Sequence, residues 1–133
     1  MRVMLDTNVL ISAAVLSSPY MLELLDVLAD GHAIVLSIYV VDELKRVTKQ
    51  KFPGKSEMLE TFLRELPFEL TYTPEKIDPS KYPDIRDLKD LPILATAISE
   101  DVDVLLSGDG DFAPLDMERP KVLTPREFME KYR

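Results

Sequence analysis

Arg2-Val3-Met4-Leu5-Asp6 places a carboxylate directly after a short apolar run near the start of the chain. This run is too short and too continuous for an amphipathic helix, and it is typical of a strand that is buried on both faces. Strands of this kind belong to parallel sheets that are covered by helices. The opening residues therefore predict a buried parallel strand over 2–5, with Asp6 at its carboxyl end.

The rest of the chain alternates between apolar runs and helical patterns. Strands are predicted at 33–36, 68–72, 102–106 and 121–123, and helices at 19–30, after Ser37, after Ser56, from near Asp90 and after Thr124. The last helix has a capping box, Thr124 to Glu127, with proline at its first position. The proline-containing stretch 73–87 is the one long irregular connection. This alternation predicts an α/β fold with a parallel sheet.

Composition limits the class of protein. With 133 residues, of which 46% are hydrophobic, we expect a single globular domain over 1–133. The absence of cysteine excludes a disulfide scaffold, a thiolate zinc site and a cysteine nucleophile. No apolar run reaches the roughly 20 residues that span a bilayer, and residues 1–16 lack the features of a signal peptide. We expect a soluble, cytoplasmic protein with no membrane association.

Four acidic residues are predicted to meet at one edge of the sheet. Asp6 and Asp109 follow predicted strands, Asp90 lies at a helix start, and Glu43 lies one turn into the helix after the second strand. Ligands of open parallel sheets bind outside the carboxyl ends of the strands, where the strand order reverses. If the first and fourth strands are neighbours, these carboxylates face one crevice.

Clustered carboxylates repel each other unless a cation lies between them. An all-oxygen cluster without cysteine favours Mg²⁺ or Mn²⁺ over zinc or copper. Magnesium commonly bridges protein carboxylates to phosphate oxygens, so the predicted chemistry is metal-dependent cleavage of a phosphodiester bond. Each acid also has a simpler interpretation as a cap, a turn residue or a solvated side chain.

Four segments resemble the PIN-domain ribonucleases, in particular the toxins of prokaryotic toxin-antitoxin pairs. These segments are MLDTNVLISA at 4–13, VVDEL at 40–44, RDLKDLPILATAI at 86–98 and LLSGDGDF at 105–112. The resemblance implies a three-layer α/β/α sandwich whose five parallel strands have the order 3-2-1-4-5. It also implies hydrolysis of single-stranded RNA, a small antitoxin partner and possible homodimers.

The same resemblance assigns roles to individual residues. Asp6, Glu43, Asp90 and Asp109 are similar to the acidic metal-binding residues of the family. The residues similar to its auxiliary groups are Thr7, Asn8, Asp87, Ser107 and Asp111. Asp87 and Asp90 compete for one position, and Asp90 is preferred because it lies nearer the helix start.

The net charge of −8 opposes broad binding of nucleic acid, although several of these charges belong to the predicted site. A run without acidic residues follows Glu43, and its residues Lys45, Arg46 and Lys49 are candidates for contacts with an RNA backbone. The alternative interpretation of this run is a solvated helix face.

Three alternatives stay open at this point. A receiver-like signalling domain also carries aspartates and Mg²⁺ at strand ends, but it usually has a pair of acids after the first strand. A haloacid-dehalogenase-type phosphatase needs a second aspartate where Asn8 stands. The third alternative is a PIN-like module that binds RNA or protein without catalysis.

Overall fold

A computed structural model describes residues 1–85, 87–108 and 117–133 of the chain. Its five strands form one sheet in the order β3-β2-β1-β4-β5, and every pairing is parallel. The strands are β1 (Arg2–Leu5), β2 (Ala33–Ser37), β3 (Phe68–Thr71), β4 (Val104–Leu106) and β5 (Lys121–Leu123). This arrangement confirms the predicted strand order, and it makes the first and fourth strands neighbours across the switch point.

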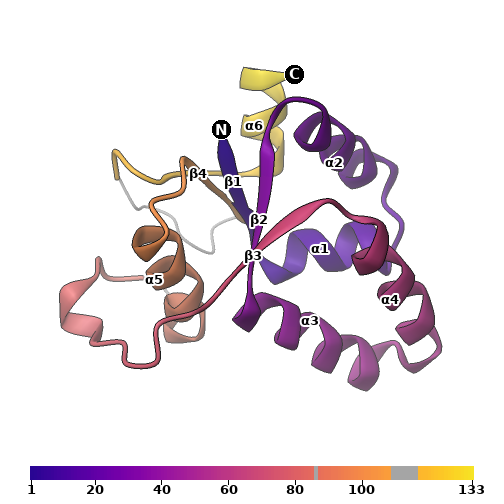
Figure 1. Cartoon of the computed structure of the whole chain (residues 1–133), viewed down its shortest axis with the longest axis horizontal. Coiled ribbons are helices and arrows are strands. Elements are labelled where there is room, and N and C mark those ends of the chain that lie inside the picture. The colour runs from indigo at the N-terminus through magenta and orange to yellow at the C-terminus, as the bar shows by residue number, and fades with distance from the viewer. Residues whose placement is uncertain (86, 109–116) are drawn as a thin grey trace.

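Helices cover both sides of the sheet, which confirms the three-layer arrangement. They are α1 (Thr7–Ala14), α2 (Pro19–Gly31), α3 (Ile38–Lys51), α4 (Ser56–Glu65), α5 (Leu91–Ser99) and α6 (Pro125–Tyr132). Short 3₁₀ turns are η1 (Pro53–Lys55), η2 (Pro79–Lys81) and η3 (Leu88–Asp90). In Figure 1, α1 to α4 gather to the right of the strands, α5 lies to the left, and α6 lies near α2.

The centre of the sheet is the centre of the core. Val3, Met4 and Leu5 of β1 are fully buried because helices pack on both faces of this strand. Phe128 of α6 is also fully buried, at the amino-terminal edge of the sheet. The position of β1 explains why its sequence is a continuous apolar run with no polar alternation.

One helix was not predicted. α1 begins directly after β1 because the Asp6 carboxylate accepts a hydrogen bond from Val9 N and so caps the helix. Its β-branched residues Thr7, Val9 and Ile11 are weak helix formers, and burial of one face offsets that preference. The predicted cap at Ser56 is wrong, since Ser56 is the first residue of α4 and Lys55 holds the cap position without a side-chain bond.

Within the described residues, no single helix is long and apolar enough to cross a membrane. α1 and α2 together satisfy such a test of length and composition, but they are bent by 111° relative to one another. Both helices bury apolar side chains in the core, among them Leu10 and Leu28.

Candidate active site

Asp6 is the most firmly held acid at the carboxyl edge of the sheet. Its side chain is 4% exposed, and its backbone N donates to Leu106 O at 3.1 Å, which extends the pairing of β1 with β4. Oδ1 accepts from Val9 N at 3.0 Å, while Oδ2 accepts from Ser107 Oγ at 2.6 Å and from Gly108 N at 3.2 Å. Groups from both sides of the switch point therefore fix this carboxylate in one orientation.

Glu43 reaches the same edge from α3. Thr7 Oγ1 donates to Glu43 Oε1 at 2.5 Å, so the residue after Asp6 holds the second acid. Glu43 Oε2 lies 3.7 Å from the Arg46 guanidinium, one turn further along α3. The Glu43 side chain is 25% exposed, which leaves it accessible to solvent while its position is set by these two contacts.

Asp87 and Asp90 lie at the two ends of the turn that precedes α5. Asp87 Oδ1 accepts from Lys89 N at 2.9 Å and thereby caps η3. Asp90 ends η3 at the start of α5, and its carboxylate makes no capping hydrogen bond to that helix. The alternative interpretation of Asp90 as a side-chain cap of α5 is therefore not supported, and Asp87 caps the 3₁₀ turn that precedes this helix.

A cleft of about 330 Å³ brings three of these acids together. Glu43, Asp87 and Asp90 line it, and Thr7 and Asn8 line it from the start of α1. The buried Asp6 does not line the cleft, but the next residue of the chain, Thr7, does. The cleft collects residues from α1, α3 and the 73–90 connection, as the position of the switch point predicts.

Tyr39 gives a second sign that the acids share one environment, and it was not anticipated from the sequence. Its hydroxyl donates to Lys89 O at 3.1 Å, which ties α3 to the turn that carries Asp90. Burial raises the pKa of Tyr39, and the negative charges of Glu43, Asp90 and Asp87 raise it further. The available signal was spacing, since residues 39 and 43 face the same side of a helix.

The donor groups suit a hard divalent cation, because all of them are carboxylate, hydroxyl or amide oxygens. The described residues do not by themselves assemble three acidic or histidine side chains closely enough to hold a metal ion. Asp109 and Asp111 lie outside the described residues.

The basic residues of α3 do not all face the cleft. Lys45 Nζ lies 3.9 Å from Glu60 of α4, and Arg46 pairs with Glu43. Lys45, Arg46 and Lys49 are absent from the lining of this cleft, whereas Lys51 and Lys89 contribute to it.

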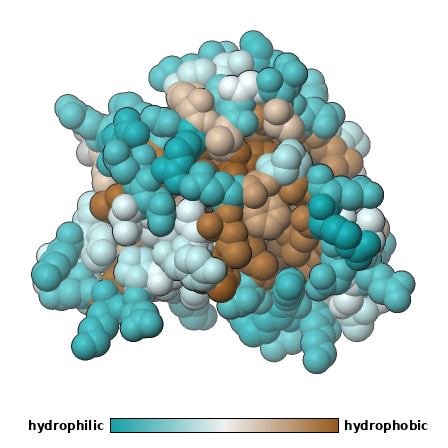
Figure 2. All heavy atoms as spheres, viewed as in Figure 1, coloured by the Kyte–Doolittle hydropathy of each residue, from teal (hydrophilic) through white to brown (hydrophobic). Residues whose placement is uncertain are grey.

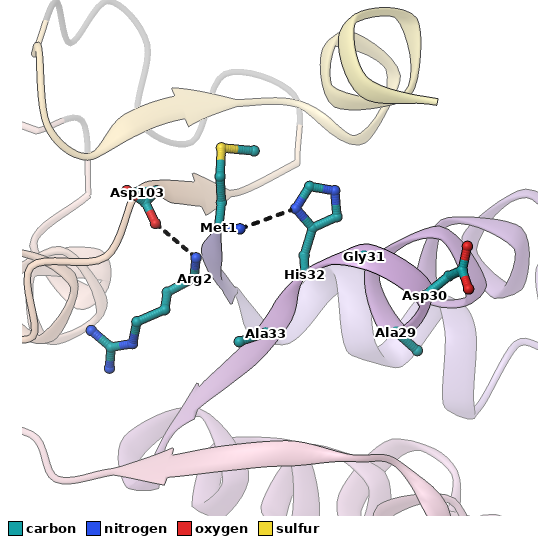
Figure 3. Close-up of a pocket in the computed structure, with 8 residues that line it drawn as sticks. All are labelled: Met1, Arg2, Ala29, Asp30, Gly31, His32, Ala33 and Asp103. Atoms are coloured by element: carbon teal, nitrogen blue, oxygen red, sulfur yellow. Dashed lines mark hydrogen bonds between the residues drawn. The ribbon is translucent and has the colours of Figure 1, made fainter.

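A larger pocket of about 550 Å³ lies at the opposite, amino-terminal edge of the sheet. Figure 3 shows that the Arg2 side chain points away from His32, while the Asp103 carboxylate accepts from Arg2 N at 2.7 Å. The Arg2 guanidinium instead contacts Glu69 at 2.8 Å and Glu100 at 3.6 Å. The charged groups of Arg2 and Asp103 are engaged in holding this edge of the sheet together, so we assign the functional site to the smaller acidic cleft.

Comparisons with known proteins identify the family and support the fold. A family model described as PIN domain matches residues 2–111. Among solved structures, the chain is similar to one in the crystal structure of VapBC2 from Rickettsia felis bound to a DNA fragment from their promoter, with a TM-score of 0.66 and 23% identity. That alignment covers 82% of this chain and 89% of the other, and at this identity it supports the fold. No curated protein sequence matches the chain.

Proposed function

Because the chain belongs to the PIN-domain family, we propose that it is a nuclease that hydrolyses phosphodiester bonds of single-stranded RNA. The observation that carries the proposal is the acidic cleft at the switch point, where Glu43, Asp87 and Asp90 lie beside the buried Asp6. Clefts at this position are the usual ligand sites of open parallel sheets. A receiver-like domain is disfavoured by the family match.

The proposed cofactor is Mg²⁺ or Mn²⁺, held by Asp6, Asp90 and Asp109 with Glu43 beside them. When bound, such an ion supplies charge stabilisation at the scissile phosphate and a nucleophile at neutral pH. Several oxygen ligands are needed to hold such an ion, and Asp109 is proposed as one of the residues that supply them.

The protein groups have separable tasks in this proposal. Ser107 and Gly108 orient Asp6 from the β4 side, and Thr7 orients Glu43. Glu43 is the accessible acid that would position the attacking water, because its carboxylate is partly exposed at the cleft. Asn8 and Asp87 complete the polar lining, and Asp111 remains a proposed auxiliary acid.

We further propose that the biological role is that of a toxin held in check by a small antitoxin protein. The similar solved structure is that of VapBC2, and this likeness supports a protein partner for the chain.

Figure 2 shows apolar side chains gathered where α1 lies between α2 and α4. A groove there is lined by Leu22, Leu25, Phe62 and Leu66, with Asp26 and Glu65 also in its walls. Leu22 is exposed and Phe62 and Leu66 are half-buried, and an apolar groove of this kind is typical of a protein interface. A homodimer is a second use of such a surface.

The decisive experiment compares the wild type with Asp6→Asn on a mixed pool of single-stranded RNA. We expect cleavage by the wild type with Mn²⁺, none with chelator, and a loss of about 100-fold or more in Asp6→Asn. Asp30→Asn is the matched control, since Asp30 is an exposed acid at the far end of α2. Its cleavage should equal that of the wild type.

Two results would count against the proposal. Equal cleavage by the wild type and Asp6→Asn would show that this site is not the source of the activity. RNA binding without cleavage under any divalent ion would favour the non-catalytic module. Because Asp6 also caps α1, unfolding of each variant by urea must be measured alongside.

A further inference from the structure

The acidic cleft continues beyond the acids along one face of α3. Glu43, Val47 and Lys51 all line it, and they follow one another at intervals of four residues. Eight residues of α-helix rise about 12 Å, so Lys51 lies well separated from the carboxylate end. Ile11 of α1 and Phe52, which follows α3, line the cleft as well. The cleft therefore has an acidic half and a second half of different chemistry.

This second half combines apolar and cationic side chains. Ile11, Val47 and Phe52 are half-buried, and Lys51 is exposed. Among the described residues Lys51 forms no ion pair, in contrast to Lys45 and Arg46 on the same helix. An ammonium group and an aromatic ring that line one cleft are a combination that proteins use to bind single-stranded nucleic acid.

We propose that this half of the cleft is a subsite for the nucleotide that flanks the scissile phosphate. The base packs against Phe52, Ile11 and Val47, and Lys51 contacts a backbone phosphate. This inference rests on the proposed nuclease function, and it adds a substrate-binding surface to the acidic centre.

Size and chemistry both favour one unpaired nucleotide as the occupant. The whole cleft, acids included, has a volume of about 330 Å³, which lies at the lower end of the range for small-molecule sites and suits a single nucleotide. Only an unstacked base can present its face to an aromatic side chain. The subsite thereby accounts for a preference for single strands, which the acids alone would not create.

The phosphate contact is tested by the salt dependence of binding. A fluorescent oligouridylate is titrated with protein in the presence of chelator, so that cleavage cannot occur, at several salt concentrations. Lys51→Ala should weaken binding and reduce the slope of log Kd against log salt by about 0.7, the value for one phosphate contact with a single strand. Lys121→Ala is the control, because Lys121 is exposed at the start of β5 and does not line the cleft.

The base contact is tested with oligouridylates in which single bases are removed in turn. One abasic position should weaken binding to the wild type by roughly 5-fold or more, as expected for loss of a stacked base. In Phe52→Leu the same abasic position should carry a much smaller penalty, because the ring that it contacted is gone. Phe52 packs against the core, so Val47→Asn provides a second variant if Phe52→Leu unfolds.

The outcomes separate the subsite from the nuclease proposal. If the wild type cleaves RNA but Lys51→Ala and Lys121→Ala have equal salt slopes, and no abasic position depends on Phe52 or Val47, the subsite is wrong and the nuclease stands. If the wild type neither binds nor cleaves RNA, both proposals fall.

Discussion

Replacing Ser107 by alanine tests how strongly the site acid Asp6 is held. The Ser107 hydroxyl is buried, and it donates to Asp6 Oδ2 at 2.6 Å, a short bond to a charged acceptor. Such bonds contribute about 1.5–3 kcal/mol to the free energy of unfolding. Gly108 N still donates to the same oxygen at 3.2 Å in the variant. We therefore expect Ser107→Ala to lower the free energy of unfolding by about 1.5–2 kcal/mol, the lower part of that range.

Urea unfolding at neutral pH, followed by circular dichroism, measures this loss directly. A domain of this size should lose about 4 °C of melting temperature per kcal/mol, so the expected fall is about 6–8 °C. Ser99→Ala, at the exposed end of α5, is the matched control and should stay within about 0.5 kcal/mol of the wild type. In an Asp6→Asn background, Ser107→Ala should lose much of its effect, because the charged acceptor is gone. A loss below about 0.5 kcal/mol in the wild-type background would refute the argument that this bond fixes Asp6.

Two further predictions concern other parts of the molecule. Thr7→Val keeps the shape of the side chain but removes the hydroxyl that donates to Glu43, so we expect the rate of RNA cleavage to fall by about 10–100-fold. Unchanged kcat and KM would show that Glu43 needs no such support. Burial, with a smaller effect of the N-terminal amine, lowers the pKa of His32 below 6.5, so the unfolded chain binds more protons than the folded chain just below that pH. Stability should therefore be complete above pH 6.5 and decline as the pH falls towards the folded pKa, and His32→Gln should remove this component from urea midpoints measured between about pH 5 and 7.5.

Much of the sheet was predictable from the sequence because burial leaves a strong signal there. The run before Asp6 lies between helices on both faces, so every residue of it after Arg2 had to be apolar. Thr124 and Glu127 formed the predicted capping box because both groups of that motif lie within four consecutive residues. The strand order itself followed from the family resemblance, since periodicity cannot show which strands pair.

Predictions failed where tertiary contacts override local preference. α1 was missed because its β-branched residues favour strands, while packing against α2 and α3 and the Asp6 cap decide the outcome. Lys45 points towards Glu60 because of where α4 packs. Lys51 lines the cleft because of where η3 packs. Tyr39 was overlooked because its partner is a backbone carbonyl fifty residues away in the chain.

The site itself was predictable only in outline. Glu43 and Asp90 line one cleft, and Asp6 directly precedes Thr7, which lines it too. The hydrogen bond from the Thr7 hydroxyl to Glu43 joins α1 to α3, and no local sequence pattern reveals that contact. The predicted roles of Asp109 and Asp111 remain predictions, because both residues lie outside the described part of the chain.

The hydrogen bond that Val9 N donates to the Asp6 carboxylate gives this residue a structural task in addition to its proposed chemical one. A helix of this kind can begin as well with serine or asparagine as with aspartate, since each presents an oxygen to the first turn. A lineage that lost its chemistry but kept its fold could exchange Asp6 for asparagine, which keeps the cap and places a polar group beside Ser107, whereas alanine would weaken the start of α1 and remove the acceptor of the Ser107 hydroxyl. The residue at this one position in a descendant would therefore record whether selection still acted on the reaction or only on folding.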